Sequence, residues 1–415
     1  MQHDKMNIAL VCDYFYPNKG GVETHIKMIG EGLIKLGHNV IVITHKYAGY
    51  KGAIQIGNLL VYYLDLPVFI MNTTTPTIFT NYILFKAIFE KHSIEIVHGH
   101  QSLSNLCLES IYHASNLNIK TVLTDHSVFE VAKFERVIVN NLCSFMCTYL
   151  DFAISVSSVS KENTQLRLNL QDDKMAVIPN GIIPEIFYPK TEKYKVGEKI
   201  RLIVMCRLVF RKGLDLLIGA LPLICKNKDI EIFIVGDGVK KSEIEQTVAE
   251  NELEQQVKIL DEIKYEDVGD ILRTGHLFLN TSLTETFCLA ILEAMSCGLM
   301  VVSTNVGGIH ELFSESEIYF CEPTADDIAE QVFSAARDLE NHDPSKIFNS
   351  IKTKCSWSTI SKQIESVYKS IPNKKVSLSA KIRHFSANGG FLMTLATFYE
   401  YFQIHFFEMI ESLVK

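Results

Sequence analysis

The stretch from Asn280 to Glu311 constrains the fold more strongly than any other part of the sequence. An apolar run ends at its first residue, and the polar residues that follow have the chemistry of a turn and a helix N-cap. Apolar side chains then recur at helical spacing over residues 287–295, and Gly298 stands where a helix would end. Residues 300–304 form a second apolar run. We therefore predict a strand, a helix and a second strand, the unit from which parallel α/β sheets are built.

Two carboxylates in this unit, Glu285 and Glu293, are eight residues apart in the sequence. Eight residues turn about 80° beyond two full helical turns, so we expect the two side chains on roughly the same side of the helix. The mouth of such a unit lies at the carboxyl end of the strands, where open α/β sheets bind ligands. Two carboxylates there suit hydrogen bonds from the hydroxyls of a sugar or a ribose. The alternative is a pair of solvated acids on the helix surface.

Length and composition indicate the number of domains and exclude some classes of function. A chain of 415 residues exceeds one ordinary hydrophobic core, so we predict two domains. The formal net charge of −8 offers no basic field for nucleic acid. The ten cysteines are scattered without a CxxC pair, which favours reduced thiols. The first strand, at 6–12, follows the N-terminus without a signal-peptide pattern.

The first half of the chain alternates strand-like and helical patterns. Gly20 and Gly21 come after the first strand, at the start of a predicted helix at 22–36. Backbone N–H groups at such a helix start favour a phosphate or a sugar oxygen, although a purely structural turn is the alternative. His126 directly follows a strand-like run and is expected to point into the same cleft from the opposite wall. A lone histidine is usually structural, and the position at the end of a strand makes the functional alternative about equally favoured.

The second half repeats the alternation after a polar stretch at 189–199. Arg207 and Lys212 flank a strand-to-helix turn that is backed by Gly213. An arginine that can chelate and a lysine that supplies a point charge suit a diphosphate, and a solvated basic turn is the alternative. No two aspartates stand two residues apart, so the metal-binding DxD of many nucleotide-sugar enzymes is absent. We therefore expect the two cations, and no divalent metal, to meet the charge of the leaving group.

Three regions follow from these patterns. We expect an acceptor-side domain at 1–188, a nucleotide-sugar-binding domain at 189–371, and a tail at 372–415, with the two α/β domains doubly wound and facing a cleft. The tail carries four basic residues ahead of an apolar stretch at 391–407: Lys374, Lys375, Lys381 and Arg383. As a helix that stretch spans about 25 Å, short of the roughly 30 Å hydrocarbon core. We expect an amphipathic helix on a membrane surface; a spanning helix and a helix packed back on the protein are the alternatives.

The quoted motifs together carry a resemblance to a known family. The chain resembles the retaining nucleotide-sugar transferases of the GT-B fold, glycosyltransferase family 4, whose hallmark is the E-x7-E pair. The matching stretches run in order over about residues 7 to 325: CDYFYPNKGGVETHI, GHNVIVITH, TDHSVF, CRLVFRKGLDLL and NTSLTETFCLAILEAMSCGLMVVSTNVGGIHE. Within the family it most resembles the catalytic subunits that transfer N-acetylglucosamine (GlcNAc) from UDP-GlcNAc to phosphatidylinositol, the first step of GPI-anchor biosynthesis.

The resemblance implies roles for individual residues. Gly20 and Gly21 would contact the phosphate or sugar of the donor, and His126 would lie beside the transferring sugar. Arg207 and Lys212 would bind the diphosphate. Glu285 would bind the sugar hydroxyls, and Glu293 the ribose of uridine. Those implied in catalysis are His126, Arg207, Lys212 and Glu285. No protein nucleophile is evident, so we expect front-face attack assisted by the leaving diphosphate, without a metal cofactor.

The resemblance also implies a setting. We expect companion subunits of a GlcNAc-transferase complex, a membrane surface, the cytosolic face of the endoplasmic reticulum, and no nucleic acid. One alternative keeps the fold but changes the acceptor to another lipid or a soluble sugar. A second is a non-catalytic nucleotide-sugar-binding or scaffold protein, which would have no need of all four charged residues. A dehydrogenase is not supported, because no GxGxxG with a following acid is present.

Overall fold

The protein forms two compact units in a computed structural model, which describes residues 5–18, 20–68, 73–74, 81–129, 134–190, 194–314 and 316–373. Among the described residues, the first unit takes in those up to 156, 160–178 and 361–373, and the second takes in 157–159 and 179–360. The expected second domain ran to 371, whereas residues 361–371 belong to the first unit. The predicted tail helix at 391–407 and the basic residues before it lie outside the described residues. No described helix is long and apolar enough to cross a membrane.

The first unit is built on an eight-stranded sheet. Its strands are β1 (Asn7–Val11), β2 (Asn39–His45), β3 (Gly52–Ile56), β4 (Leu59–Leu64), β5 (Ile96–His100), β6 (Lys120–Asp125), β7 (Phe152–Ser155) and β8 (Met175–Val177). They are ordered β3-β4-β2-β1-β5-β6-β7-β8. All neighbours are parallel except the β3–β4 hairpin at the edge. The sheet grows outward in both directions from β1 and β5, so the loops after these two strands meet at the topological switch point.

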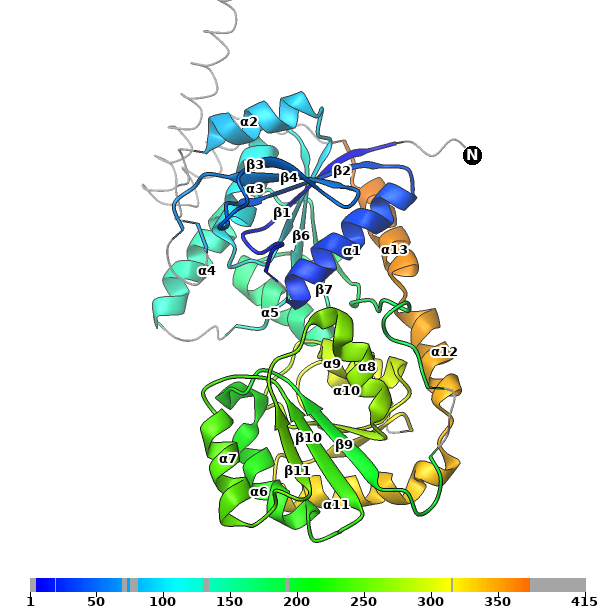
Figure 1. The fold of residues 1–415 in the computed structure, drawn as a ribbon. Coiled ribbons are helices and arrows are strands. Elements are labelled where there is room, and N and C mark those ends of the chain that lie inside the picture. Colours follow the sequence, from blue (N-terminus) through cyan, green and yellow to red (C-terminus); the bar gives the residue numbers. More distant parts are fainter. Residues whose placement is uncertain are drawn as a thin grey trace, which may run out of the picture. The chain divides into compact units, whose positions relative to one another are not determined.

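Helices cover both faces of this sheet (Figure 1). One face carries α1 (Gly21–Lys35) and the last described helix, α13 (Trp357–Ser370). The other carries α2 (Tyr82–Lys91), α3 (Asn105–Asn116) and α4 (Phe134–Met146), with α5 (Ser158–Leu168) and the short η1 (Asp172–Lys174) completing the unit. The helix expected at 22–36 is confirmed as α1. The hydroxyl of Tyr368, on α13, lies 2.6 Å from His98 Nδ1 on β5, which fixes this helix to the sheet.

The second unit is built on a six-stranded, fully parallel sheet. Its strands are β9 (Ile200–Met205), β10 (Ile230–Val235), β11 (Val257–Leu260), β12 (Leu277–Asn280), β13 (Met300–Thr304) and β14 (Ile318–Cys321). They are ordered β11-β10-β9-β12-β13-β14. Numbered along the chain this is 3-2-1-4-5-6, the doubly wound order of dinucleotide-binding folds. The switch point lies between β9 and β12, so the loops after these strands face one another.

Two helical layers enclose the second sheet. One layer consists of α6 (Leu214–Ile224), α7 (Lys241–Glu250) and α11 (Ala325–Asp338), which pack on one another. The other contains α8 (Val268–Thr274), α9 (Leu289–Ser296) and α12 (Pro344–Lys354). The short elements are η2 (Phe210–Lys212), η3 (Tyr265–Asp267), α10 (Ile309–Leu312) and η4 (Leu339–Asn341). The sequence prediction of strands at the apolar runs ending at Asn280 and spanning 300–304 is confirmed by β12 and β13.

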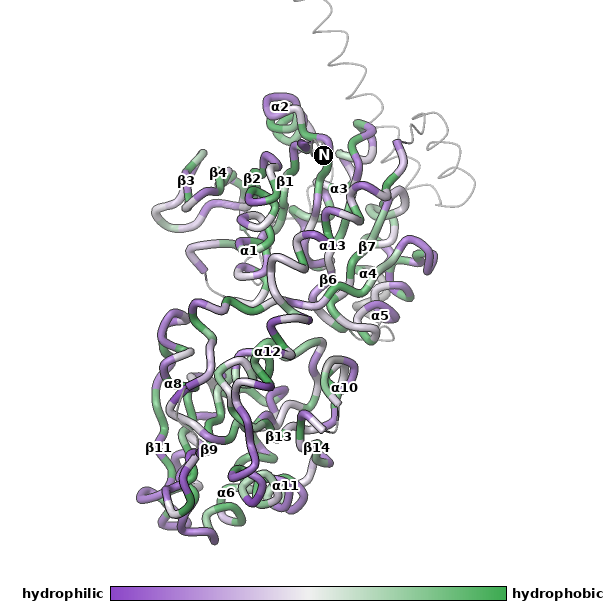
Figure 2. Tube along the Cα trace, turned by 90° about the vertical axis from the view of Figure 1, so that its right-hand side faces the viewer, coloured by the Kyte–Doolittle hydropathy of each residue, from purple (hydrophilic) through white to green (hydrophobic). Residues whose placement is uncertain are grey.

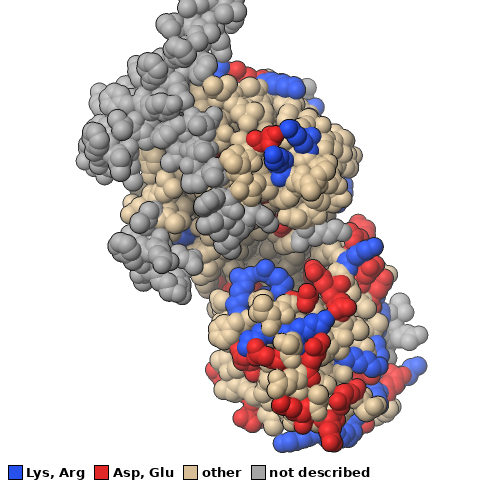
Figure 3. Space-filling model, turned by 60° about the vertical axis from the view of Figure 1, so that its left-hand side comes forward, with Lys and Arg blue, Asp and Glu red and all other residues tan. Residues whose placement is uncertain are grey.

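The hydrophobic core of each unit lies along its sheet. In Figure 2 the hydrophobic colour follows strands such as β1, β2 and β7. Strands β12 and β13 are buried at every residue, as expected for parallel strands with helices on both faces. Charged side chains of both signs are interspersed over the face of the second unit in Figure 3, in keeping with the moderate net charge of −8.

Candidate functional site

The loops after β9 and β12 are joined at the switch point of the second sheet. The Thr281 hydroxyl donates to the Lys212 carbonyl at 2.9 Å, and the Leu283 N–H donates to the Arg211 carbonyl at 3.0 Å. These hydrogen bonds connect the turn between Arg207 and Lys212 to the loop that carries Glu285. The sequence predicted each loop separately, and the strand order brings them together.

Gly213 allows the two loops to approach this closely. Its φ of +67° lies in the left-handed region that favours glycine. A Cβ atom built there would stand 1.7 Å from the Thr281 carbonyl oxygen, which is backbone and cannot turn away. The glycine behind Lys212 is therefore required by the loop contact, in addition to its place at the start of α6.

Lys212 and Glu285, which the sequence predicted as separate ligands for the donor, form an ion pair with each other. The Ser282 hydroxyl donates to the same Glu285 oxygen at 2.8 Å. Side-chain exposures are 20% for Lys212 and 12% for Glu285, so the pair is largely withdrawn from water but accessible at one side. Burial works against the ammonium form, but the neighbouring Cys288 and Glu285 outweigh it and raise the pKa of Lys212. The lysine is thus held charged.

The backbone of Glu285 is clamped from the other side by the turn after β13. Gly307 has a φ of +59°, and a Cβ atom there would stand 1.7 Å from the Glu285 carbonyl oxygen. The Gly308 N–H donates to that same carbonyl at 3.2 Å. The turn at Gly307 and Gly308 therefore positions Glu285 by close backbone contact.

Glu293 lies on α9 and is buried. The hydroxyl of Tyr265, in η3, donates to Glu293 Oε1 at 2.8 Å. Burial raises the pKa of Glu293 to about 7, and the hydrogen bond from Tyr265 opposes this rise. Neither Glu285 nor Glu293 is the solvated surface acid that the sequence left as the alternative.

The prediction that one helix carries both acids is wrong. Cys288 has a φ of +56°, so α9 begins at Leu289 and residues 281–288 form a loop. Glu285 lies in this loop, while Glu293 lies inside the helix. The helix does end before Gly298, as predicted. The apolar spacing at 287 belongs to a loop side chain that packs into the core, which hydrophobic periodicity alone does not distinguish from the first turn of a helix.

Arg207 follows β9 and is exposed. Within the described part of the chain its guanidinium joins neither the Lys212–Glu285 pair nor another acid. An exposed guanidinium at the carboxyl end of a strand is available to an anionic ligand. The structure therefore brings Lys212 and Glu285 together and leaves Arg207 at the edge of their loop.

The first-unit candidates gather at the corresponding switch point. Gly20 is the N-cap of α1 and Gly21 its first residue, so first-turn N–H groups of a 15-residue helix are presented there. A Cβ atom at Gly21 would meet nothing within 4 Å, so packing does not require this glycine.

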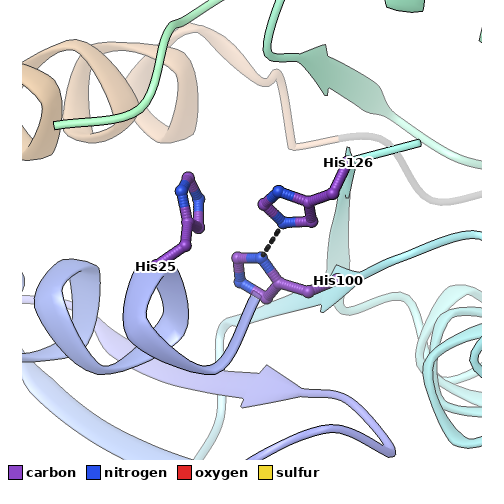
Figure 4. Close-up of side chains that lie close together, drawn as sticks. All are labelled: His25, His100 and His126. Carbon is purple, nitrogen blue, oxygen red and sulfur yellow. Dashed lines mark hydrogen bonds between the residues drawn. The ribbon is translucent and has the colours of Figure 1, made fainter. Parts of the chain in front are cut away.

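His126 follows β6 and belongs to a cluster of histidines, although the sequence treated it as isolated. Its Nε2 lies 3.4 Å from Nδ1 of His100, the last residue of β5. The ring of His25, on α1, packs against it with centroids 4.5 Å apart (Figure 4). Burial, and next the proximity of His98, lower the pKa of His126 to about 3. The ring is therefore neutral at physiological pH.

A buried ion pair holds the segment that carries His126. Asp125, the last residue of β6, pairs with Arg167 of α5 at 3.0 Å, and both side chains are fully buried. The same carboxylate accepts from the Ser102 hydroxyl at 2.7 Å and from the His126 N–H at 3.1 Å. This network fixes the strand end from which His126 projects.

Four residues that contact the candidate side chains were not identified from the sequence. They are Tyr265 and Ser282 in the second unit, and His25 and His100 in the first. The residues that contact Glu285 and Glu293 come from ordinary polar loop positions, and no local signal marks them. His98 and His100 stand two apart in β5, which places both on one face of the sheet. From this spacing a group of histidines at the end of β5 could have been predicted.

A hollow of about 710 Å³ lies in the first unit, away from these residues. It is lined at the amino ends of β6 and β7 by Lys120 and Phe152, and by Pro372 after α13. Ligands of open α/β sheets bind at the carboxyl ends of the strands. The candidate donor residues are therefore not associated with this hollow.

Comparisons with known proteins cover both halves of the chain. A family model described as Glycosyltransferase Family 4 matches residues 19–186, and one described as Glycosyl transferases group 1 matches residues 190–345. The chain is 38% identical over 405 residues to a human protein named as a subunit of phosphatidylinositol N-acetylglucosaminyltransferase, covering 95% of this chain and 83% of that protein. It is 38% identical to the Schizosaccharomyces pombe protein named as the gpi3 subunit of that transferase, covering 87% and 80%.

Solved structures show a similar fold. A glycosyltransferase from Rickettsia africae matches with a TM-score of 0.72 at 21% identity, over 89% of this chain and 99% of that one. Anabaena HepE in complex with UDP matches with a TM-score of 0.68 at 16% identity, over 88% and 100%. At these identities the likeness concerns the fold alone. The predicted GT-B architecture with two Rossmann-like domains is confirmed.

Proposed function

This chain belongs to the glycosyltransferase family of these phosphatidylinositol N-acetylglucosaminyltransferase subunits, and we propose that it transfers N-acetylglucosamine from UDP-GlcNAc to phosphatidylinositol with retention. The observation that carries the proposal is the Lys212–Glu285 pair at the switch point of the second sheet. Ligands of doubly wound folds bind there, and the pair offers a fixed cation and a fixed acceptor side by side.

The second unit would bind the donor. Lys212 and the exposed Arg207 would hold the diphosphate, one as a point charge and the other through its planar fork. Glu285 would accept hydrogen bonds from the sugar hydroxyls. Glu293, buried on α9, would accept from the ribose hydroxyls of uridine. The first unit would contribute Gly20 and Gly21 toward the phosphate or sugar, and His126 beside the transferring sugar.

Retention would follow from a front-face reaction. Glu285 is engaged by Lys212 and Ser282, which suits binding better than nucleophilic attack. The bond from the anomeric carbon to the diphosphate breaks, and an inositol hydroxyl forms its new bond from the same face. The departing diphosphate oxygen takes the proton of that hydroxyl. The fixed charge of Lys212 stabilises the leaving group without needing to reorganise, the kind of contribution that preorganised charge makes to catalysis.

The acceptor and setting rest on the relatives. The names of the human, plant and yeast relatives specify phosphatidylinositol as the acceptor and describe each protein as one subunit of the transferase. We extend both to this chain, with companion subunits, the cytosolic face of the endoplasmic reticulum membrane, and no metal cofactor. Conversion of the donor without a phosphatidylinositol product would point to another acceptor, a lipid or a soluble sugar.

The deciding experiment is a transfer assay with radiolabelled UDP-GlcNAc and phosphatidylinositol, using membranes that contain the full chain and its companion subunits. The wild type is compared with Lys212→Ala and Glu285→Ala. Arg201→Ala is the matched control, because Arg201 pairs with Glu231 in the same unit at the amino ends of β9 and β10, opposite the switch point. We expect product with the wild type and the control and no product with either site variant. Addition of a chelator should not abolish the product. Normal product in Lys212→Ala would overturn the assignment of the site. If the wild type forms no product and binds no donor, the result would favour a non-catalytic scaffold protein.

A further inference from the structure

The histidine cluster of the first unit has a composition that the proposed sugar transfer does not require. Three elements contribute one ring each: α1, the end of β5 and the segment after β6 (Figure 4). A nitrogen of His25, one of His100 and one of His126 all lie within 4.8 Å of one another. We propose that these three imidazoles form a binding site for a first-row transition-metal ion, with Zn²⁺ as the reference ion, and that its occupancy switches the enzyme off.

The spacing of the rings fits one ion. With Zn–N distances of about 2.0–2.1 Å, tetrahedral geometry puts two ligand nitrogens about 3.4 Å apart and their ring centres about 5 Å apart. His100 Nδ1 and His126 Nε2 are 3.4 Å apart. The three pairs of ring centroids are separated by 4.5, 5.5 and 5.7 Å. One nitrogen pair is thus already at the required spacing, and binding needs ring rotations that bring the remaining separations, which are at most 4.8 Å, to about 3.4 Å.

Hydrogen bonding alone does not account for this arrangement. A distance of 3.4 Å between His100 and His126 is longer than a good N–H···N hydrogen bond. The other nitrogen of His100, Nε2, is buried and has no hydrogen-bond partner in the described part of the chain. A fully buried imidazole with one weak contact is the kind of polar group for which an ion is a recognised explanation. A metal at Nδ1 would take up the lone pair whose contact with His126 is weak, while the Nε2–H of His100 would stay without a partner among the described residues.

The donor set selects the class of ion. Three imidazoles with no carboxylate among them suit Zn²⁺, Cu²⁺, Ni²⁺ or Co²⁺, whereas Mg²⁺, Ca²⁺ and Mn²⁺ prefer oxygen. Asp125, the nearest acid in sequence, is already paired with Arg167. The site is thus chemically distinct from a diphosphate-bound magnesium.

The surroundings hold the set in place and leave one side open. His98 stacks on His100 with centroids 4.3 Å apart. It is itself fixed between the Tyr368 hydroxyl at 2.6 Å and the Thr124 hydroxyl at 2.7 Å, so it supports the ring of His100 and does not join the ligands. His126 is only partly buried, which gives an ion a route in and leaves a fourth position for water.

Inhibition, unlike binding, rests on the proposed function. If His126 lies beside the transferring sugar, an ion on its nitrogen removes it from that contact and places a hydrated divalent charge where the sugar ring belongs. Chelation would restore activity. The ion acts here as an inhibitor, so this site is compatible with transfer that needs no metal.

Binding is tested directly on the full-length protein, purified in detergent with a tag that contains no histidine. Co²⁺ replaces Zn²⁺ as the probe, because tetrahedral Co²⁺ has strong visible absorption bands. One equivalent is expected to bind to the wild type and to be displaced by Zn²⁺. His25→Gln and His100→Gln should each weaken binding by at least about tenfold, the size of loss seen even when only a supporting partner of a ligand is removed. His92→Gln, a histidine of the same unit outside the cluster, is the control and should bind normally.

The outcomes separate the two proposals. Loss of Co²⁺ binding in the two variants, with thermal unfolding like the wild type, supports the site. Wild-type binding in both variants, or no binding of one equivalent by the wild type at micromolar ion, overturns it. Zn²⁺ should inhibit wild-type transfer reversibly and His25→Gln much less. If Co²⁺ binds but the chelated wild type transfers no sugar, the proposed function fails while the metal site stands. If a variant unfolds, protection of the partly buried His126 of the wild type from carbethoxylation by Zn²⁺ decides the matter.

Discussion

Lys212 donates to Glu285 across a separation of 73 residues, and this one ion pair joins the loops after the first and fourth strands of the second sheet. Each partner leaves a largely buried charge behind if the other is removed. Mutating either residue therefore changes both the electrostatics of the site and the stability of the loops.

A double variant separates these two effects. Lys212→Ala alone should destabilise the protein, because it leaves the Glu285 carboxylate without its counter-ion, and should lower turnover by about 10²–10³. Lys212→Ala combined with Glu285→Ala should unfold at a higher temperature than Lys212→Ala while transferring no better. Thermal unfolding and transfer are measured on all three proteins. A double variant less stable than both singles would contradict the charge-pair explanation.

The buried Glu293 should make stability depend on pH. Its pKa rises from 4.5 to about 7 in the folded protein, so between these values the folded state keeps a proton that the unfolded chain releases. The free energy of unfolding then falls as pH rises from about 4.5 to 7, and this contribution is constant above that window. Glu293→Gln should flatten this part of the profile. Denaturant unfolding at pH 5, 6, 7 and 8 checks it, and an equal slope in the variant would refute it.

Donor binding should be linked to the same proton. Ribose hydroxyls donate to an ionised carboxylate, so binding favours the deprotonated form of Glu293. The affinity for UDP should therefore fall by up to about tenfold per pH unit below pH 7. Calorimetry in buffers of different ionisation enthalpy measures the proton that is released. Binding that is independent of pH between 6 and 8 would exclude contact between the ribose and Glu293.

Tyr265→Phe tests how Glu293 is tuned. The change removes the hydrogen bond to Glu293 Oε1, which holds down the pKa of the carboxyl group. The midpoint of UDP binding against pH should move upward, and stability should drop by about 0.5–1.5 kcal/mol. Tyr319→Phe is the matched control, because its hydroxyl donates to the exposed Asp338 in the same unit. Matching midpoints in the two variants would mean that Tyr265 does not act on Glu293.

Gly213→Ala should separate the two loops. The added Cβ atom would collide with the Thr281 carbonyl, and the positive φ adds a backbone cost of about 1–2 kcal/mol. We expect a clear fall in melting temperature and loss of transfer together. Gly21→Ala is the stability control, because a Cβ atom there has nothing within 4 Å. An equal melting temperature for Gly213→Ala and the wild type would show that the loops do not need this contact.

Helices and strands could be predicted from the sequence where a local pattern determines them. The apolar runs that became β12 and β13 are buried on both faces, so their pattern is continuous, and Gly298 ends α9 as its position indicates. The start of α9 was misjudged because a distant turn decides it. The contact of Gly307 with the Glu285 backbone, together with the left-handed Cys288, keeps residues 281–288 out of the helix.

The contacts between candidate residues were not readable in the same way. Lys212 and Glu285 were identified as candidates, but their pairing follows from the order of strands in the sheet. His25, His100 and His126 come from three elements that only the sheet of the first unit brings together. Sequence spacing reports neighbours on one helix or strand, and these contacts lie between elements.

The return of α13 to the first unit has a consequence for how the protein is made. Tyr368 supplies the hydroxyl that meets His98 on β5, yet roughly 190 residues separate it from the end of β8. At ribosomal rates of about 5–20 residues per second, the first sheet would wait about 10–40 s for its last helix. During that time α1 already packs at His100, but His98 on β5 lacks the cover of α13, so the newly made chain should depend on chaperones until its end emerges. A chain cut after residue 188 would remain permanently in that state.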